Sequence, residues 1–200
     1  MKTDTYILTY RPHFKLGDFI YHPFKAARAL IVQSVIRLFS QSNFHHIAHC
    51  YMDDDGVWRV SEAKYPKYRI VDLFESFYTS HCKVMAYRIQ LPVNRKRLLD
   101  FQKEMLGRDY DAKGAQFSEV HEIPILKELY EKSDNDQEIF CSESIILLLM
   151  RLKMILKVKN KNHFSPQEVF EMMLEKNIIY KNDRAQIWDG DNINCEYLSR

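Results

Sequence analysis

The apolar run that begins at Cys141 constrains the fold of this chain more than any other feature of its sequence. From Cys141 to Leu156 apolar residues occupy nearly every side of a helix, and they are continuous from Ile145 to Met150. Such a helix offers almost no polar face to water, so it is normally the buried helix of a domain. The sequence therefore predicts a central helix over 141–156, with the other elements packed around it.

Strands are expected mainly in the middle of the chain. His46–Met52 and Val57–Ala63 have the composition of strands and flank an acidic turn that ends in Gly56, which is typical of a β-hairpin. Lys83–Leu91 alternates and predicts a further strand, and 70–78 is expected to pass from a strand into a helix. Because the strands are grouped instead of alternating with helices, we expect an α+β fold.

Spacing and capping residues predict further elements. A turn with a short strand is expected over 16–21, and helices are expected over 24–39, 93–106 and 125–132. Gly107 ends the helix over 93–106, because glycine readily adopts the left-handed conformation that closes a helix. Ser165, Pro166 and Glu168 form the capping-box pattern that opens another helix, which runs to about Lys176.

Length and composition indicate one domain. The 200 residues are 46% apolar and 28% charged, so we expect a single domain over 1–200, with its core at about 16–176 and a loosely held polar tail from about Asn182.

The net charge of +2 is too small to suggest nucleic-acid binding. No apolar run approaches the roughly 20 residues of a membrane span, and no signal peptide is recognised, so we expect a cytoplasmic location. The four cysteines lie far apart and are expected to be free thiols.

Cys141 is the first candidate for chemistry. It stands at the start of the apolar helix, where unpaired N–H groups and the helix dipole favour a thiolate and could receive an oxyanion. A cysteine is also a suitable small apolar residue for the end of a buried helix. Position alone leaves both interpretations open, a nucleophile and a core residue.

His46 and Glu62 are the second and third candidates. They lie on the two strands of the expected hairpin, so the Glu62 carboxylate could bond one ring nitrogen of His46 and fix its tautomer. Taken singly, His46 is better explained as a polar residue at a strand end, and Glu62 is a weak signal that a surface ion pair would also explain. Together with Cys141 they provide a nucleophile, a base and an acid that orients the base, which nucleophilic acyl transfer needs.

Six short motifs, taken in order, resemble those of one hydrolase family. They are Leu16–Ile20 (LGDFI), His45–His49 (HHIAH), Ser61–Ala63 (SEA), Gly107–Asp111 (GRDYD), Phe140–Glu143 (FCSE) and Phe164–Pro166 (FSP). This set is similar to the circularly permuted NlpC/P60 papain-like hydrolases, and most of all to their YiiX/YebB-like branch. In papain itself the cysteine precedes the histidine, whereas Cys141 follows His46, so the resemblance requires the permuted order.

The resemblance implies a fold and roles for particular residues. It implies a small antiparallel sheet packed on the helix that carries the nucleophile. It gives the catalytic roles to Cys141, His46 and Glu62. It also places Tyr110 and Asp111 near the site, where they shape the substrate pocket or hold a loop.

Three residues depart from the family pattern around the histidine. His45 stands where serine is usual, Ala48 stands where glycine is usual, and His49 is unusual. Alternation along a strand puts His46 and His49 on opposite faces, whereas His45 and His49 share a face. Only His46 occupies the family's histidine position, so it is the expected base.

The function expected from these residues is hydrolysis of an amide by an amidase-like or peptidase-like enzyme, through a thioester and without a metal or other cofactor. The substrate expected is small and peptide-like, N-acyl or lipid-like. Two alternatives stay open: a lipid acyl hydrolase or acyltransferase of the same permuted fold, and an inactive binding module on it. A metal site that joins His45, His46 and His49 to Asp53–Asp55 is disfavoured, because the comparable zinc motif needs a helix.

Overall fold

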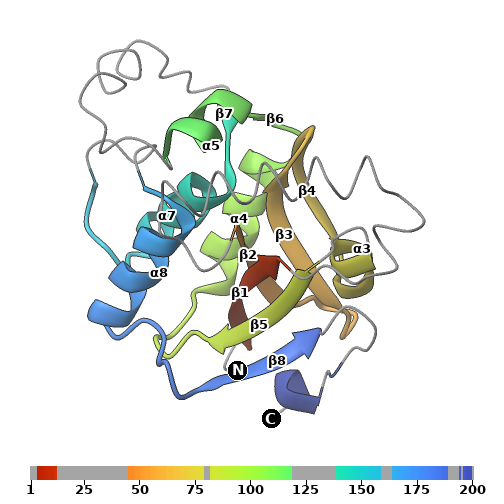
Figure 1. Ribbon diagram of the computed structural model, residues 1–200. Helices are drawn as coiled ribbons and strands as arrows, with labels where there is room; N and C mark the ends of the chain where they lie inside the picture. Colours follow the sequence, from red (N-terminus) through yellow and green to blue (C-terminus); the bar gives the residue numbers. More distant parts are fainter. Residues whose placement is uncertain are drawn as a thin grey trace.

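An eight-stranded sheet forms the centre of the part of the chain that the structure describes. The computed structural model describes residues 4–12, 45–78, 82–118, 138–158, 164–188, 194 and 196–199. The strands follow one another across the sheet in the order β7-β6-β4-β3-β2-β1-β5-β8 (Figure 1). Their bounds are β1 Thr5–Pro12, β2 His46–Met52, β3 Trp58–Lys64, β4 Lys67–Asp72, β5 Cys82–Arg88, β6 Asp109–Tyr110, β7 Glu138–Ile139 and β8 Arg184–Trp188.

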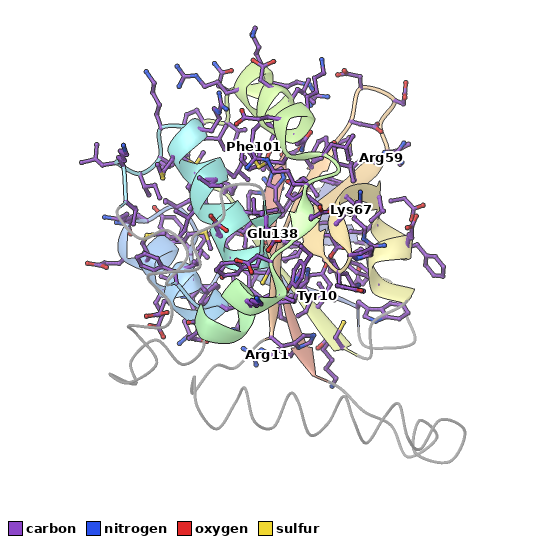
Figure 2. The ribbon with its side chains drawn as sticks, turned by 90° about the horizontal axis from the view of Figure 1, so that it is seen from above. Tyr10, Arg11, Arg59, Lys67, Phe101 and Glu138 are labelled. Atoms are coloured by element: carbon purple, nitrogen blue, oxygen red, sulfur yellow. The ribbon has the colours of Figure 1, made fainter. Side chains whose placement is uncertain are left out.

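Helices cover both faces of this sheet. α7 (Cys141–Arg151) and α8 (Pro166–Glu175) lie on one side and α3 (Leu73–Tyr78) lies on the other, as the view from above makes plain (Figure 2). α4 (Arg95–Met105) packs against α7. The remaining described helices are α5 (Ala112–Ser118) and the short 3-10 helix η2 (Glu196–Ser199). The fold is therefore mixed α+β, as the sequence predicts.

The two faces of the sheet belong to two separate apolar clusters, because successive side chains of a strand point to opposite sides. In β1, Ile7 packs with residues of α7 and α8, whereas Leu8 packs with residues of α3. Ile47 and Ala48 of β2 divide in the same way. All four side chains are buried. Burial on both faces explains why these strands contain apolar residues at successive positions instead of every second one.

The central helix begins where the sequence predicts and ends earlier. α7 starts at Cys141 but stops at Arg151, so the expected end at Leu156 is wrong. Lys153 adopts a left-handed conformation with φ 62°. Its N–H donates to the Met150 carbonyl oxygen at 3.0 Å, and the N–H of the following residue donates to the Leu149 oxygen at 2.9 Å. These two bonds form a Schellman motif, which satisfies the last carbonyls and turns the chain out of the helix.

Several other local predictions are confirmed. β2 and β3 form the expected hairpin, with Gly56 at φ 76° in its turn. α4 ends just before Gly107, which has φ 83°. The capping box at the start of α8 is complete, since the Ser165 side chain and the Glu168 side chain each bond the other residue's N–H. These features depend on a few neighbouring residues, so the sequence is sufficient to predict them.

The sheet is larger than expected, and it extends the core at both ends of the chain. β1 lies near its centre, between β2 and β5, and precedes the predicted core boundary at residue 16. β8 pairs with β5 and buries Ile187 and Trp188, so the expectation of a loosely held tail is wrong for this strand. β6 and β7 are parallel to each other, so the sheet is mixed and not purely antiparallel.

Some expectations fall outside the described residues. These are the strand at 16–21 and the helices at 24–39 and 125–132. Among the residues that the structure does describe, no helix combines the length and the apolar character needed to cross a membrane.

Candidate active site

Cys141 is the first residue of the buried helix α7. The preceding residue, Phe140, is extended, and its apolar side chain provides no hydrogen-bonding cap for the N–H groups of the first turn. Two serine side chains hold the first turn in place. Ser142 Oγ donates to the Phe164 carbonyl oxygen at 2.6 Å, and Ser144 Oγ donates to the Cys141 carbonyl oxygen at 2.6 Å. The thiol is thereby held at a helix end whose dipole favours negative charge.

His46 and Glu62 are brought together as the hairpin predicts. Both side chains point to the α3 side of the sheet: His46 lies opposite Tyr10, and Glu62 lies two residues after Val60, and both of these neighbours belong to the cluster on that side. His46 Nε2 and Glu62 Oε2 are 2.9 Å apart. Glu62 is 0% exposed and His46 is 9% exposed, so their hydrogen bond is almost completely shielded from water.

Four donor groups hold the buried Glu62 carboxylate. Arg69 donates to Oε1 through Nε at 3.0 Å and through Nη2 at 2.6 Å. Ser76 Oγ donates to Oε2 at 3.3 Å, beside the bond from His46. A buried carboxylate is stable only when it is paired and hydrogen-bonded in this way. The site therefore depends on Arg69 and Ser76, neither of which the sequence analysis identified.

The electrostatics of the pair keep it ionised. Burial by itself lowers the pKa of His46, but hydrogen bonds to Cys141 and Glu62, together with their charges, outweigh it and raise the pKa to about 9. Burial raises the pKa of Glu62, but the hydrogen bond and charge of His46 and the charges of Lys64 and Arg69 lower it to about 2. At neutral pH the site thus holds a carboxylate against a protonated imidazole.

The same imidazole also lies close to the Cys141 side chain, whose hydrogen bonding and charge both raise the pKa of His46. His46 is the first residue of β2 and Cys141 is the first residue of α7, so the two side chains meet where both elements begin. Because Nε2 is used by Glu62, the ring nitrogen left for the thiol is Nδ1. The structure therefore brings together all three residues that the sequence singled out for chemistry.

Tyr110 and Asp111 lie beside the segment that leads into Cys141. Tyr110 pairs with Ile139 of β7, two residues before Cys141. Asp111 donates its N–H to the Ile139 carbonyl oxygen at 3.1 Å, and its Oδ1 accepts the N–H of Gly114 at 2.6 Å. Asp111 therefore caps α5, and a Cβ at Gly114 would overlap its carboxylate. These contacts fix the junction of β6 and α5 beside the strand that precedes Cys141.

The two neighbouring histidines have different environments. His49 lies opposite Ile7, so it points to the α7 side of the sheet, away from His46. Burial lowers its pKa to about 3, and among the described residues neither of its ring nitrogens has a hydrogen-bond partner. Burial, helped by the charges of His46 and Lys64, lowers the pKa of His45 to about 3. Both rings are neutral at pH 7, which distinguishes them from His46.

Metal ligands do not gather in the described part of the chain. No group of three or more histidine, cysteine, aspartate or glutamate side chains there is arranged to hold an ion. Asp53 is paired with Arg59 at 2.7 Å, and Asp54 is paired with Arg95 at 2.6 Å. Cys50, Cys82 and Cys141 are buried, and no disulfide bond joins any of these three described cysteines to another.

No model of a known protein family matches the chain, and no curated protein matches it significantly. The arrangement around His46 is therefore the basis on which a function can be argued.

Proposed function

We propose that this protein is a thiol hydrolase that cleaves an amide bond through a thioester on Cys141. His46 acts as the acid and base, and Glu62 orients it. One observation carries the proposal: a single buried imidazole bonds a buried carboxylate at 2.9 Å and interacts at the same time with the cysteine side chain at a helix start. Nucleophile, base and orienting acid within hydrogen-bond reach are the parts that covalent acyl transfer needs.

The permuted papain-like architecture suggested by the sequence motifs is part of the same proposal. It is supported by the packing of α7 against β2 and β3, because those two strands carry the proposed base and its partner. It is also supported by the order of the three residues along the chain, with the nucleophile last. The mixed eight-stranded sheet is larger than the small sheet of that expectation, so the core of the proposal is the site and the helix that carries it.

In the first half of the reaction, the Cys141 thiolate attacks the carbonyl carbon and a carbon–sulfur bond forms. The carbonyl oxygen becomes an oxyanion, for which the backbone N–H of Cys141 is the first expected donor, because N–H groups at a helix start point outward. The carbon–nitrogen bond then breaks while the protonated His46 gives its proton to the leaving amine. The products of this half are a free amine and a thioester.

In the second half, water replaces the amine. Neutral His46 takes a proton from the water as its oxygen attacks the thioester carbon. The carbon–sulfur bond breaks, the carboxylic acid leaves, and the thiolate and protonated imidazole are restored. Throughout, Glu62 remains ionised and keeps Nε2 bonded, so Nδ1 stays directed at the reacting sulfur.

The first test is alkylation of each cysteine by iodoacetamide as a function of pH, assigned by mass spectrometry. We expect Cys141 to label fast near pH 6, because His46 holds the thiol proton, and we expect His46→Ala to remove this advantage. Cys50 and Cys82 are the internal controls, since both are buried cysteines that lie outside the proposed site. Labelling of Cys141 no faster than these two, with a midpoint near about 8.5, would contradict the proposal.

The second test is turnover on a panel of small amides, N-acyl compounds and phospholipids. Cys141→Ala should lower amide turnover by at least about a thousandfold, because the covalent step is lost. Cys82→Ala is the matched control and should keep turnover. Release of fatty acid from phospholipid, with no action on amides, would replace the amide by an ester substrate; full activity of Cys141→Ala would refute a thiol mechanism.

A further inference from the structure

Glu62 is joined to a second hydrogen-bonded pair on the α3 side of the sheet. Ser76 Oγ, from α3, lies 3.3 Å from Glu62 Oε2, the same oxygen that bonds His46. Tyr10 OH, from β1, lies 2.8 Å from Ser76 Oγ. All three side chains are buried, with Tyr10 at 1% exposure and Ser76 at 0%. Three elements therefore contribute to one continuous chain of hydrogen bonds that ends at the proposed base.

The chain of bonds has one direction. Glu62 is ionised at neutral pH, because its pKa is about 2, and an ionised carboxylate only accepts hydrogen bonds. Ser76 has one hydroxyl hydrogen and gives it to Glu62, so Tyr10 must be the donor to Ser76. Burial, followed by the charge of Glu62, raises the pKa of Tyr10 well above its ordinary value, so that Tyr10 keeps its hydrogen. The order is Tyr10 to Ser76 to Glu62.

Tyr10 also contacts the imidazole itself. Its ring centroid lies 4.9 Å from that of His46, with the two planes inclined at 59°. Tyr10 is among the side chains labelled in Figure 2, in the strand that neighbours β2. One residue thus packs on the ring of His46 and, through Ser76, reaches the carboxylate that bonds this ring.

We infer that Tyr10 and Ser76 are positioning residues, which fix the orientation of the Glu62 carboxylate and moderate its hold on the protonated His46 ring. The Ser76 hydroxyl donates to Glu62 Oε2 and shares its negative charge, and the Tyr10 hydroxyl polarises this donor by donating to Ser76 Oγ. The attraction of that oxygen for the imidazolium is weaker as a result, so the ring can release its proton to a leaving group. The inference rests on the proposed function for its effect on turnover, while its effect on His46 can be measured without a substrate.

Other titratable and charged groups face these residues and must stay constant in a test. Cys141 acts on His46, and Lys64 and Arg69 act on Glu62. Cys50 and Cys82 act on Tyr10. These five residues come from five different elements. Glu75 of α3 also bonds Arg69, at 3.4 Å. Removing only a hydroxyl leaves all of them in place, so a change in His46 then reports the hydroxyl chain.

The variants are Ser76→Ala and Tyr10→Phe, each of which removes one hydroxyl and keeps the rest of the packing. The measurement is the titration of the His46 ring protons by NMR, together with the pH dependence of Cys141 alkylation. Ser76→Ala should move the His46 midpoint upward by roughly half to one pH unit, because Oε2 then bonds the imidazolium alone. Tyr10→Phe should move it in the same direction by less. Where turnover is measurable, its alkaline limb should move with the His46 midpoint.

The chain offers a matched control on the other side of the sheet. Tyr68 and Ser61 are also a buried, hydrogen-bonded tyrosine–serine pair, and Tyr68 packs with α4. Tyr68→Phe and Ser61→Ala remove the same groups and should leave the His46 midpoint where it is. A shift in Ser76→Ala and Tyr10→Phe no larger than in these controls, or a downward shift, would overturn the inference. Loss of the proposed function would be recognised separately, by full turnover of Cys141→Ala.

Discussion

At the scale of single residues, Glu62 determines the electrostatics of the candidate site. A carboxylate with no exposure to water is strongly disfavoured unless its charge is compensated. Arg69 and His46 supply that compensation from the neighbouring strands on both sides. Removing one partner of such a buried pair destabilises a protein more than replacing the whole pair by apolar residues, because an uncompensated charge stays behind.

Glu62→Gln is therefore expected to lower the free energy of unfolding by about 3–5 kcal/mol at neutral pH. The physical reason is that the Glu62 side chain, which is 0% exposed, no longer carries the negative charge that compensates Arg69. Urea unfolding followed by circular dichroism measures the change. Glu75→Gln is the control: Glu75 also bonds Arg69, but it is half exposed, so its loss should cost less than about 1 kcal/mol.

The same variant tests the pH dependence of stability. The pKa of Glu62 falls on folding from 4.5 to about 2, so its contribution is complete above pH 4.5 and is lost as the pH falls toward 2. The pKa of His46 rises on folding from 6.5 to about 9, so its contribution is complete below pH 6.5 and is lost as the pH rises through 9. The stability difference between the two proteins should be largest between pH 4.5 and 6.5. A difference independent of pH would contradict this account.

The sequence was sufficient to single out the three residues that the structure brings together, but not the residues that support them. Cys141 follows from its place at the start of an apolar helix, and His46 and Glu62 follow from the hairpin. Arg69 lies directly opposite Glu62 in the β3–β4 pairing, which an alignment of the two strands could have indicated. Ser76 and Tyr10 reach Glu62 only through tertiary packing, so no local pattern predicts them.

At the scale of elements, helix starts were more predictable than helix ends. The start of α8 depends on Ser165 and Glu168, whose side chains and spacing are visible in the sequence. The end of α7 depends on Lys153, a residue type that seldom adopts a left-handed conformation. The apolar pattern continues past this point, so it predicted too long a helix.

Lys153→Gly should therefore stabilise the protein by about 1 kcal/mol, because glycine adopts this conformation without the steric cost of a side chain. A shift of the urea midpoint to higher concentration would report the gain. Lys153→Ala removes the same charged side chain but keeps the Cβ, and it should give no such gain. Equal effects of the two substitutions would show that the charge, and not the backbone, is responsible.

At the scale of the whole molecule, the sheet is built from segments that lie far apart in the sequence. β1 and β8 come from opposite ends of the chain, and both pair with β5. The sequence predicted the hairpin between neighbouring strands, because a short turn determines it. It did not predict β1, because β1 is buried on both faces and lacks the alternation of a half-exposed strand.

Removal of residues 182–200 should accordingly destabilise the protein by roughly 4 kcal/mol or more, because three buried side chains lose their contacts. These side chains are Ile187, Trp188 and Leu198. Urea unfolding measures the loss. Arg184→Ala, an exposed position in the same strand, is the control and should change stability by less than about 0.5 kcal/mol. An unchanged midpoint for the truncated protein would show that this strand contributes nothing to the core.

The positions of His46, Glu62 and Cys141 along the chain have a consequence for the order in which the candidate site assembles during folding. His46 and Glu62 are joined by one short hairpin, whereas Cys141 comes from a distant helix. Contacts between neighbouring segments form faster than contacts that close a long loop. A partly folded chain can therefore hold the histidine and its carboxylate while its cysteine is still an ordinary thiol. The sulfur gains its histidine only with the completed molecule, so under the proposed function an incomplete or newly synthesised chain would not yet carry an activated thiol.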